Sequence, residues 1–445
     1  MPSFSIPLSG LQSNATSLNT IANNLTNLNT TAYKEVKTTF SDLFYANVGQ
    51  SGNGDQIAAG EGVQVASNTT DFSQGSYDTS GTTSSDMAID GNGFFILDNT
   101  GSQLYTRNGS FSEDSSGHLV SSDGLSLMGY SATNGVVSTS GSLTDITLPT
   151  TGSVMSPSAT TSFTLGGNLD SADTTGTSYS STVAVYDSLG QAHNVTMTYT
   201  KTGDNTWSYS ASMSIKDFSN YDSTASPAQS DPVIASGSLI FNSNGTLTQV
   251  DTGSTTATSG TTVGTATGDI STIALNTSTY TSGTLADGAS SISMNWKLLD
   301  SSNSPTISQV DSDSSTTSAK ANGYASGTYT GFSVDSDGTV NAEYSNGETQ
   351  AVGQVALANF QNLQGLDKLG SSEYKATNTS GAAAIAVAGA GGMGTIKDSA
   401  LEDSNVDIST EFANLIVAQR AFEANSKAVT TFDTVTQDTI NLIHA

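Results

Sequence analysis

The fold is decided at the carboxyl end, by residues 407–445, DISTEFANLIVAQRAFEANSKAVTTFDTVTQDTINLIHA. Apolar residues recur there at intervals of seven, with Thr436 in the one polar position: Ile408, Leu415, Phe422, Val429 and Ile443. Four further residues widen the apolar stripe: Phe412, Ala418, Phe432 and Ile440. A seven-residue repeat keeps one seam of a helix against a neighbouring helix and favours a left-handed supercoil. This stretch therefore predicts a long helix that has a partner helix.

The expected partner lies at the amino end, where residues 1–33 carry no charged side chain. Its apolar residues follow the spacing of one helix face: Leu11, Ala15, Leu18, Ala22 and Leu25, with Ile21 and Leu28 beside them. The opposite face consists of Asn, Ser, Thr and Gln, which are weak helix formers, so this helix needs a partner to be stable. The pattern alone leaves two alternatives, an internal helix pair or an assembly surface. The uncharged face favours assembly.

We therefore expect the contacts between assembled copies to come from the two apolar stripes. These residues are Leu11, Ala15, Leu18, Ile21, Ala22, Leu25, Leu28, Ile408, Phe412, Leu415, Ala418, Phe422, Val429, Phe432 and Ile440.

The long middle of the chain is predicted to be β-structure. Only 35% of the 445 residues are hydrophobic and 12% are charged, and the Ser, Thr, Asn and Gly that remain favour strands and turns. The fold class is mainly β, multi-domain, with α-helical coiled-coil termini and the β domains inserted between them. The expected parts are a helical domain (residues 1–35 and 403–445), a connector (36–75), an inner β domain (76–155 and 321–397) and an outer inserted β domain (156–320).

Charge and composition exclude several classes of function. A formal charge of −28 disfavours binding to nucleic acid or to an anionic membrane, because both carry the same sign. The absence of Cys excludes a disulfide framework and a thiolate metal site. No run of 18 apolar residues predicts a membrane span, and residues 1–6 lack the features of a secretory signal peptide. We expect any export to use a route without a cleaved signal peptide.

The motifs that suggest chemistry are weak. The run Gly389, Gly391, Gly392 and Gly394 fits a dinucleotide-binding pattern, but too little chain follows for that fold, and a flexible hinge is the preferred interpretation. The segment from Asp335 to Gly338 is expected to be a hairpin turn. His118, His193 and His444 are far apart in the sequence and never at metal-ligand spacing. We expect no cofactor, no metal and no enzymatic activity.

Several short segments together resemble the flagellar rod and hook proteins. At the amino end these are Ser9-Gly10-Leu11, Ile21-Ala22-Asn23-Asn24-Leu25 and Asn29-Thr30-Thr31-Ala32-Tyr33-Lys34, where the family usually has Gly-Phe in place of Ala32-Tyr33. At the carboxyl end they are Leu401-Glu402-Asp403-Ser404-Asn405-Val406-Asp407 and Ala418-Gln419-Arg420-Ala421-Phe422-Glu423-Ala424-Asn425-Ser426-Lys427. Gly167-Asn168-Leu169-Asp170 and Tyr186-Asp187-Ser188-Leu189-Gly190 look like features of the hook members.

The resemblance implies a subunit of the bacterial flagellar hook. Its copies would build a curved, bendable tube with the terminal helices inside and the β domains outside, which passes torque from the motor to the filament. Implied partners are other copies of the chain, the distal rod, the hook cap, the hook-filament junction proteins and the flagellar type III export apparatus. The implied location is extracellular, on the flagellum and attached to the basal body.

Two alternatives remain open from the sequence. A secreted β-rich adhesin or glycan-binding module would suit the acidic middle region, which is rich in Ser and Thr. A rod-type axial protein would share the terminal helices, but rod proteins of this kind lack the large central insertion.

Overall fold

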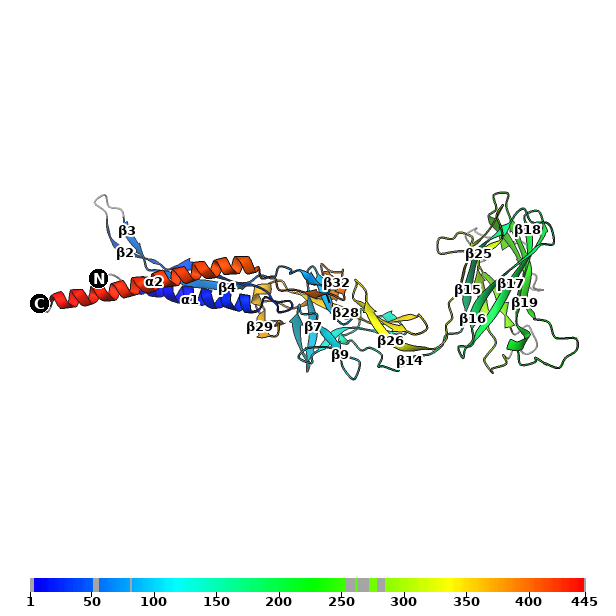
Figure 1. Ribbon diagram of the computed structural model, residues 1–445, viewed down its shortest axis with the longest axis horizontal. Helices are drawn as coiled ribbons and strands as arrows, with labels where there is room; N and C mark the ends of the chain where they lie inside the picture. The colour runs from blue at the N-terminus through cyan, green and yellow to red at the C-terminus, as the bar shows by residue number, and fades with distance from the viewer. Residues whose placement is uncertain are drawn as a thin grey trace. The chain divides into compact units, whose positions relative to one another are not determined.

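The structure, a computed structural model, describes residues 4–50, 56–80, 82–252, 261–262, 272–277 and 285–443 (Figure 1). The chain forms two compact units. Unit 1 comprises residues 1–151, 331–343 and 349–445, and unit 2 comprises residues 152–330 and 344–348. Within the described ranges, no helix combines the length and the apolar character needed to cross a membrane.

Two helices from opposite ends of the chain lie side by side in unit 1 (Figure 1). They are α1 (Ser5–Thr26) and α2 (Ile408–Ile443). They run antiparallel, because Phe4 at the start of α1 packs on Phe432 near the end of α2, with 6.1 Å between the ring centroids. The fold class predicted from the sequence, mainly β with helical ends, is confirmed.

The segment expected as a connector forms strands. These are β1 (Val36–Asp42), β2 (Tyr45–Gln50), β3 (Gln56–Gly60) and β4 (Val63–Thr70). β1 pairs antiparallel with β4, and β2 pairs antiparallel with β3. Turn-rich composition concealed this sheet in the sequence, because its strands carry Thr, Ser and Asn where an ordinary strand carries alternating apolar residues.

Two short strand pairs join the helices to the inner β region. β5 (Tyr77–Asp78) pairs with β33 (Leu401–Glu402), and β6 (Met87–Asp90) pairs with β32 (Thr395–Asp398). A buried ion pair lies at the first of these junctions. Lys34 Nζ is 2.5 Å from Glu402 Oε1, and neither side chain is exposed to solvent.

Glu402 has further partners at this junction. The Gly75 N–H donates to Oε1 at 3.0 Å, and Arg107 Nε lies 3.8 Å from Oε2. Burial lowers the pKa of Lys34 and of Arg107, while the Glu402 charge opposes that shift in both. The carboxylate therefore favours the charged forms of two side chains that burial disfavours.

The inner sheet follows the order β26-β27-β28-β11-β7-β8-β30-β29. Its strands are β7 (Phe94–Asn99), β8 (Ser102–Thr106), β11 (Ser126–Thr133), β26 (Gly327–Val334), β27 (Thr339–Tyr344), β28 (Thr349–Asn359), β29 (Asp367–Gly370) and β30 (Glu373–Lys375). Shorter strands pair along it: β9 (Phe111–Glu113), β10 (Leu119–Ser121), β12 (Val136–Val137), β13 (Thr144–Asp145), β14 (Val154–Met155) and β31 (Ala384–Val387). A short 3₁₀ turn, η3 (Leu363–Gly365), follows β28.

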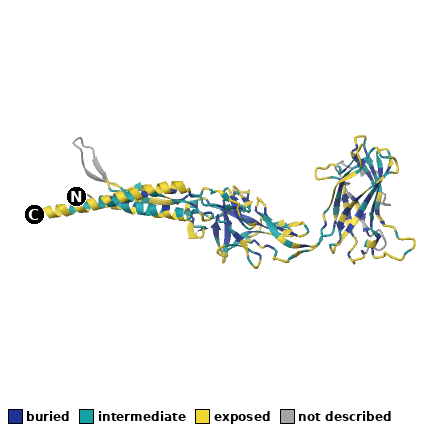
Figure 2. Cartoon of the chain, viewed as in Figure 1, coloured by how far each residue is buried: buried dark blue, intermediate teal, exposed yellow. Residues whose placement is uncertain are grey.

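β7 is buried on both of its faces. Phe95 and Leu97 face one apolar core, whereas Phe94 and Ile96 face a second core on the other side. A strand buried on both faces needs a continuous apolar run, and Phe94 to Leu97 provides it. Figure 2 shows this part of unit 1 as its most deeply buried region.

Unit 2 contains two sheets around one core. The first has the order β16-β17-β18-β19-β20-β21: β16 (Ser178–Tyr186), β17 (Ala192–Gly203), β18 (Thr206–Met213), β19 (Val233–Phe241), β20 (Leu247–Thr252) and β21 (Thr261–Thr262). The second contains β15 (Ser162–Asp170), β22 (Thr272–Asn276), β23 (Ser293–Lys297), β24 (Ile307–Val310) and β25 (Ser315–Ala321). The 3₁₀ turn η1 (Ile215–Asp217) follows β18. Trp207 and Trp296 are fully buried between the sheets, and Phe163 stacks on Trp296.

The buried ion pair generates a prediction. Glu402→Gln leaves Lys34 and Arg107 buried without their carboxylate, so we expect the local stability of the junction to fall by about 3–5 kcal/mol. Native-state hydrogen exchange of the β5 and β33 amides measures this change.

The matched control is Asp71→Asn. Asp71 pairs with Lys37 at 2.7 Å, but the Lys37 side chain is 54% exposed, so its loss should cost no more than about 1 kcal/mol. Equal losses in the two variants would contradict the role given to Glu402.

Candidate assembly surface

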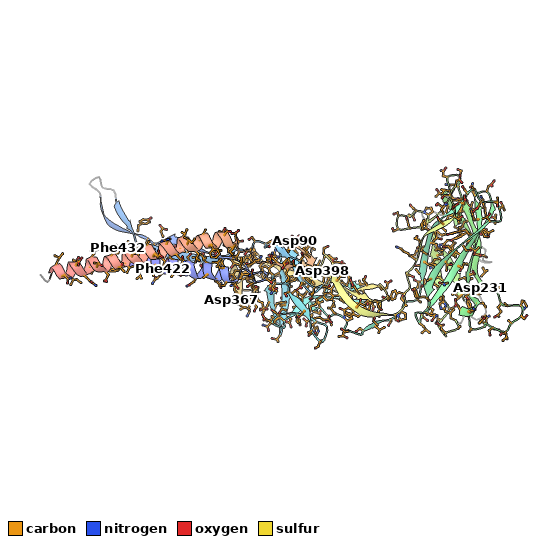
Figure 3. The ribbon with its side chains drawn as sticks, viewed as in Figure 1. Asp90, Asp231, Asp367, Asp398, Phe422 and Phe432 are labelled. Carbon is orange, nitrogen blue, oxygen red and sulfur yellow. The ribbon has the colours of Figure 1, made fainter. Side chains whose placement is uncertain are left out.

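Close contact between α1 and α2 begins at a glycine. A Cβ atom on Gly10 would come within 3.0 Å of the Asn425 side chain, so a larger residue would require that side chain to shift. Asn425 turns its amide back to the Ala421 carbonyl of its own helix, at 3.0 Å. Figure 3 labels Phe422 and Phe432, which flank this contact along α2. Gly10 thus allows α1 to approach the polar side chain of Asn425 on α2 closely.

Asn24 is the polar centre of the helix pair. Its Nδ2 donates to Glu411 Oε2 at 3.1 Å and to the Val36 carbonyl at 2.9 Å. Its Oδ1 accepts from the Val36 N–H and from the Tyr33 hydroxyl, each at 3.1 Å. One buried amide therefore links α1, α2 and the start of β1, and all of its hydrogen-bonding groups are used.

The β1–β4 sheet covers part of the uncharged face of α1. Thr38 donates to Thr20 Oγ1 at 3.0 Å, and the Val63 N–H donates to Ser9 Oγ at 3.2 Å. The Ser13 hydroxyl in turn donates to the Val63 carbonyl. Part of the face that suggested assembly is thus occupied within the chain, by hydrogen bonds that need no charge.

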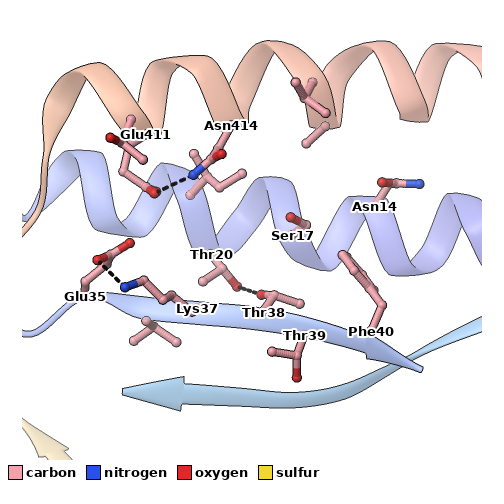
Figure 4. Close-up of a pocket in the computed structure, with 15 residues that line it drawn as sticks. Asn14, Ser17, Thr20, Glu35, Lys37, Thr38, Thr39, Phe40, Glu411 and Asn414 are labelled. Carbon is pink, nitrogen blue, oxygen red and sulfur yellow. Dashed lines mark hydrogen bonds and ion pairs between the residues drawn. The ribbon is translucent and has the colours of Figure 1, made fainter. Parts of the chain in front are cut away.

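A groove of about 480 Å³ remains between α1, α2 and β1 (Figure 4). Its walls are mixed, with Val417 and Phe40 beside an ion pair of Glu35 with Lys37 at 3.3 Å. Burial raises the pKa of Glu35, and its hydrogen bond with Lys37 opposes that rise. The groove is open and its charged groups are paired, which suits contact with another protein surface.

The expected assembly residues differ in exposure. Ile21 and Ala418 are buried in the helix pair. Nine are half-buried: Leu11, Ala15, Leu18, Leu25, Leu28, Leu415, Phe422, Val429 and Phe432. Four are exposed: Ala22, Ile408, Phe412 and Ile440. The side chain of Ile443 lies outside the described residues. The stripes therefore serve both the internal helix pair and the outer surface of α2.

Other exposed apolar residues were missed by the heptad analysis. On α2 they include Ile416 and Val417, which are 58% and 69% exposed, and on α1 they include Ile6 and Leu8. Phe40 and Phe44 add exposed aromatic rings from the expected connector. A search for apolar residues on every face of the helix would have found Ile416 and Val417, because a helix apolar on several sides has several neighbours.

The glycine run expected as a hinge lies in a turn. Gly389, Gly391, Gly392 and Gly394 lie between β31 and β32, where the Gly389 N–H donates to the Gly394 carbonyl at 2.9 Å. The first three have positive φ, and a Cβ on Gly394 would meet the Asp90 carbonyl at 2.3 Å. These observations explain why glycine is needed at these positions, and the hinge stays a prediction.

Models of flagellar axial proteins match most of the chain. The flagella basal body rod protein model matches residues 6–34, and the flagellar hook protein FlgE/F/G D1 domain matches residues 88–168. The flagellar basal body protein FlaE D2 domain matches residues 147–324, and the flagellar basal body rod FlgEFG protein C-terminal model matches residues 397–442.

Curated relatives match over full length. The chain is 34% identical to the flagellar hook protein FlgE of Salmonella typhimurium, over 99% of this chain and 100% of the relative. It is 34% identical to that of Escherichia coli, over 99% of each, and 28% identical to that of Treponema pallidum, over 98% of each. The crystal structure of Helicobacter pylori flagellar hook protein FlgE2 aligns with a TM-score of 0.49 at 12% identity, covering 74% of this chain and 100% of that one.

The polar centre of the helix pair generates a prediction. Asn24→Ala removes the donor to Oε2 of the buried Glu411 and the acceptor of the Val36 N–H, so we expect α1 and α2 to lose about 2–3 kcal/mol of local stability. Hydrogen exchange of the α1 amides measures this loss. The control is Asn23→Ala, one residue away and exposed, where we expect about 1 kcal/mol or less. Similar protection in both variants would show that Asn24 does not hold the pair together.

Proposed function

The chain belongs to the flagellar hook protein family, and from this premise we propose that α1, α2 and the β1–β4 strands form the surface through which its copies assemble. The chain is a structural subunit of the bacterial flagellar hook, which is extracellular and attached to the basal body, and it is not an enzyme. The match of residues 147–324 to the D2 domain makes a rod-type protein the less favoured alternative.

The observation that carries this proposal is the apolar surface left on α2. Ile416 and Val417 are more than half exposed in the single chain, and Phe412 is 50% exposed. Their side chains emerge from the helix on faces that α1 does not cover. Contiguous exposed apolar surface of this kind is characteristic of protein contact sites, because its removal from water yields about 25 cal/mol per Å².

The absence of charge on α1 supports the same proposal. α1 has no acidic residue in its first turn and no basic residue in its last, and residues 1–33 carry no charge at all. Packing such a helix against several neighbours removes no side-chain ion of its own from water, so the desolvation penalty that opposes burial of charged helices is small. Hydroxyl and amide groups on these faces still make hydrogen bonds, as they do with β1.

The proposal extends to the specific partners of the tube. The rod-protein models match residues 6–34 and 397–442, which contain α1 and α2. We therefore propose that the same helix pair joins the first hook copies to the distal rod, and the last copies to the hook-filament junction proteins. The same proposal includes the hook cap as a partner. It also includes export of the chain through the flagellar type III apparatus, without a cleaved signal peptide. In this proposal, the tube formed by the copies is curved and bendable and transmits torque.

The test of the assembly surface is Ile416→Asp. A carboxylate at this position would be buried between copies without a partner, so we expect tube formation to be lost. Negative-stain microscopy and sedimentation of the purified chain measure assembly. Circular dichroism should be unchanged, because Ile416 is 58% exposed before assembly.

Ile416→Met is the matched control. It keeps an apolar side chain of similar volume, and we expect it to form tubes as the original chain does. The proposal fails if Ile416→Asp assembles as well as Ile416→Met.

A further inference from the structure

A cluster of potential metal ligands lies in unit 2, away from the helices. One ligand atom from each of Asp187, His193 and Asp287 lies within 4.8 Å of the other two. Asp187 follows β16, His193 lies on β17, and Asp287 belongs to the segment before β23. Three separate pieces of chain thus bring two carboxylates and one imidazole together.

Asp187 is oriented by its own turn. Its Oδ1 accepts from the N–H groups of Leu189 and Gln191, at 2.8 and 2.9 Å, and its Oδ2 lies 3.0 Å from His193 Nε2. The residue is fully buried. One oxygen is therefore fixed by the backbone, while the other is directed at the cluster.

The buried Asp187 carboxyl and the Asp287 carboxyl lie within reach of one ion. A buried carboxylate is commonly paired with an opposite charge or bound to a metal.

The two ring nitrogens of His193 face different carboxyl groups, Nε2 that of Asp187 and Nδ1 that of Asp217. The residue is 5% exposed, and among the described residues its Nδ1 makes no hydrogen bond. The Asp217 carboxylate lies beside that nitrogen, with Oδ2 at 3.4 Å. A histidine that binds a metal through one nitrogen commonly turns the other toward a carboxylate, which fixes the ring and its tautomer. Nε2 on the cluster side and Nδ1 facing Asp217 reproduce that pattern.

We propose that Asp187, His193 and Asp287 bind one divalent first-row transition metal ion, with Zn²⁺ the expected occupant. An imidazole with two carboxylates is a ligand set for Zn²⁺ and its neighbours, whereas Ca²⁺ and Mg²⁺ prefer oxygen ligands throughout. Asp217 acts as the positioning residue that holds the His193 ring.

The metal would fasten two loops at one end of the unit 2 core. The Ala286 N–H already donates to the Asp217 carbonyl at 2.9 Å, and Phe218 forms a β-bridge with Leu285. Asp287 therefore stands beside η1 before any ion binds. A metal bond to Asp187 would then tie both segments to the turn between β16 and β17, and would stabilise unit 2 by binding only its folded state.

The sequence predicted no metal site, for a reason that the structure makes clear. Asp187 and His193 are close in the chain, but the third ligand is contributed by a distant segment. Local ligand spacing cannot find a site whose residues are brought together by sheet pairing and loop packing.

The test is zinc binding by the full-length, tag-free chain after removal of metals with a chelator. Isothermal titration with ZnCl₂ should give one binding site. Asp287→Asn should raise the dissociation constant of that site at least tenfold. Asp287 is exposed, so this variant should keep the fold. Zn²⁺ should raise the melting temperature of unit 2 in the original chain and not in Asp287→Asn.

Asp300→Asn is the matched control. Asp300 builds the same kind of turn, accepting from the N–H groups of Ser302 and Ser304 at 2.8 and 2.9 Å, but it belongs to no such cluster in the described residues. We expect Asp300→Asn to bind Zn²⁺ as the original chain does. We expect the same of a second control, His118→Gln.

Three results would overturn the proposal. One is the absence of saturable one-to-one binding, and another is binding that Asp287→Asn leaves unchanged. The third is an NMR spectrum with excess Zn²⁺ in which both nitrogens of His193 still carry protons, since a protonated Nε2 cannot bind the metal.

Discussion

The contact between Lys34 and Glu402 is the constraint on which the architecture of unit 1 depends. These two residues lie on the segments that connect α1 and α2 to the inner sheet, and their ion pair is fully buried. The Ala32 N–H also donates to the Glu402 carbonyl at 2.7 Å, so backbone and side chain are both engaged. A buried ion pair adds little net stability compared with apolar packing, but it penalises every arrangement in which one charge loses the other. Its value here is specificity, because it permits one register between the two ends of the chain.

That register determines what the helices present to solvent. With the ends fixed at Glu402, Asn24 meets Glu411, Gly10 meets Asn425 and Phe4 meets Phe432. The contacts of α1 are therefore polar at one end and apolar at the other. Other apolar residues of α2, among them Phe412, Ile416 and Val417, stay exposed. The register of the helix pair is fixed within one chain, but part of the apolar surface of α2 stays exposed. That exposed surface is available for contacts between copies.

Sequence reasoning predicted the parts of this fold that repeat and missed the parts that depend on a single contact. The seven-residue spacing identified α2, and the composition rich in Ser, Thr, Asn and Gly identified the β-structure of the middle. The β1–β4 sheet was missed because its bonds to α1 are made by Ser and Thr hydroxyls, which leave no hydrophobic period. The sequence also cannot reveal that the Asp90 carbonyl lies where a Cβ of Gly394 would stand. Ala32 is similar: it stands where the family usually has Gly, and its φ of 56° explains that preference.

The two units differ in how they obtain their stability, and this difference bears on assembly. Unit 2 closes two sheets around its own core, with Trp207, Trp296 and Phe163 fully or almost fully buried, so it has what it needs to fold without neighbours. α1 and α2 bury few residues completely, and helices of weak intrinsic propensity gain most of their stability from packing. Neighbouring copies would therefore stabilise the helices far more than unit 2. In the proposed assembly, the contact energy would come mainly from the terminal helices, and the fold of unit 2 would not depend on that energy.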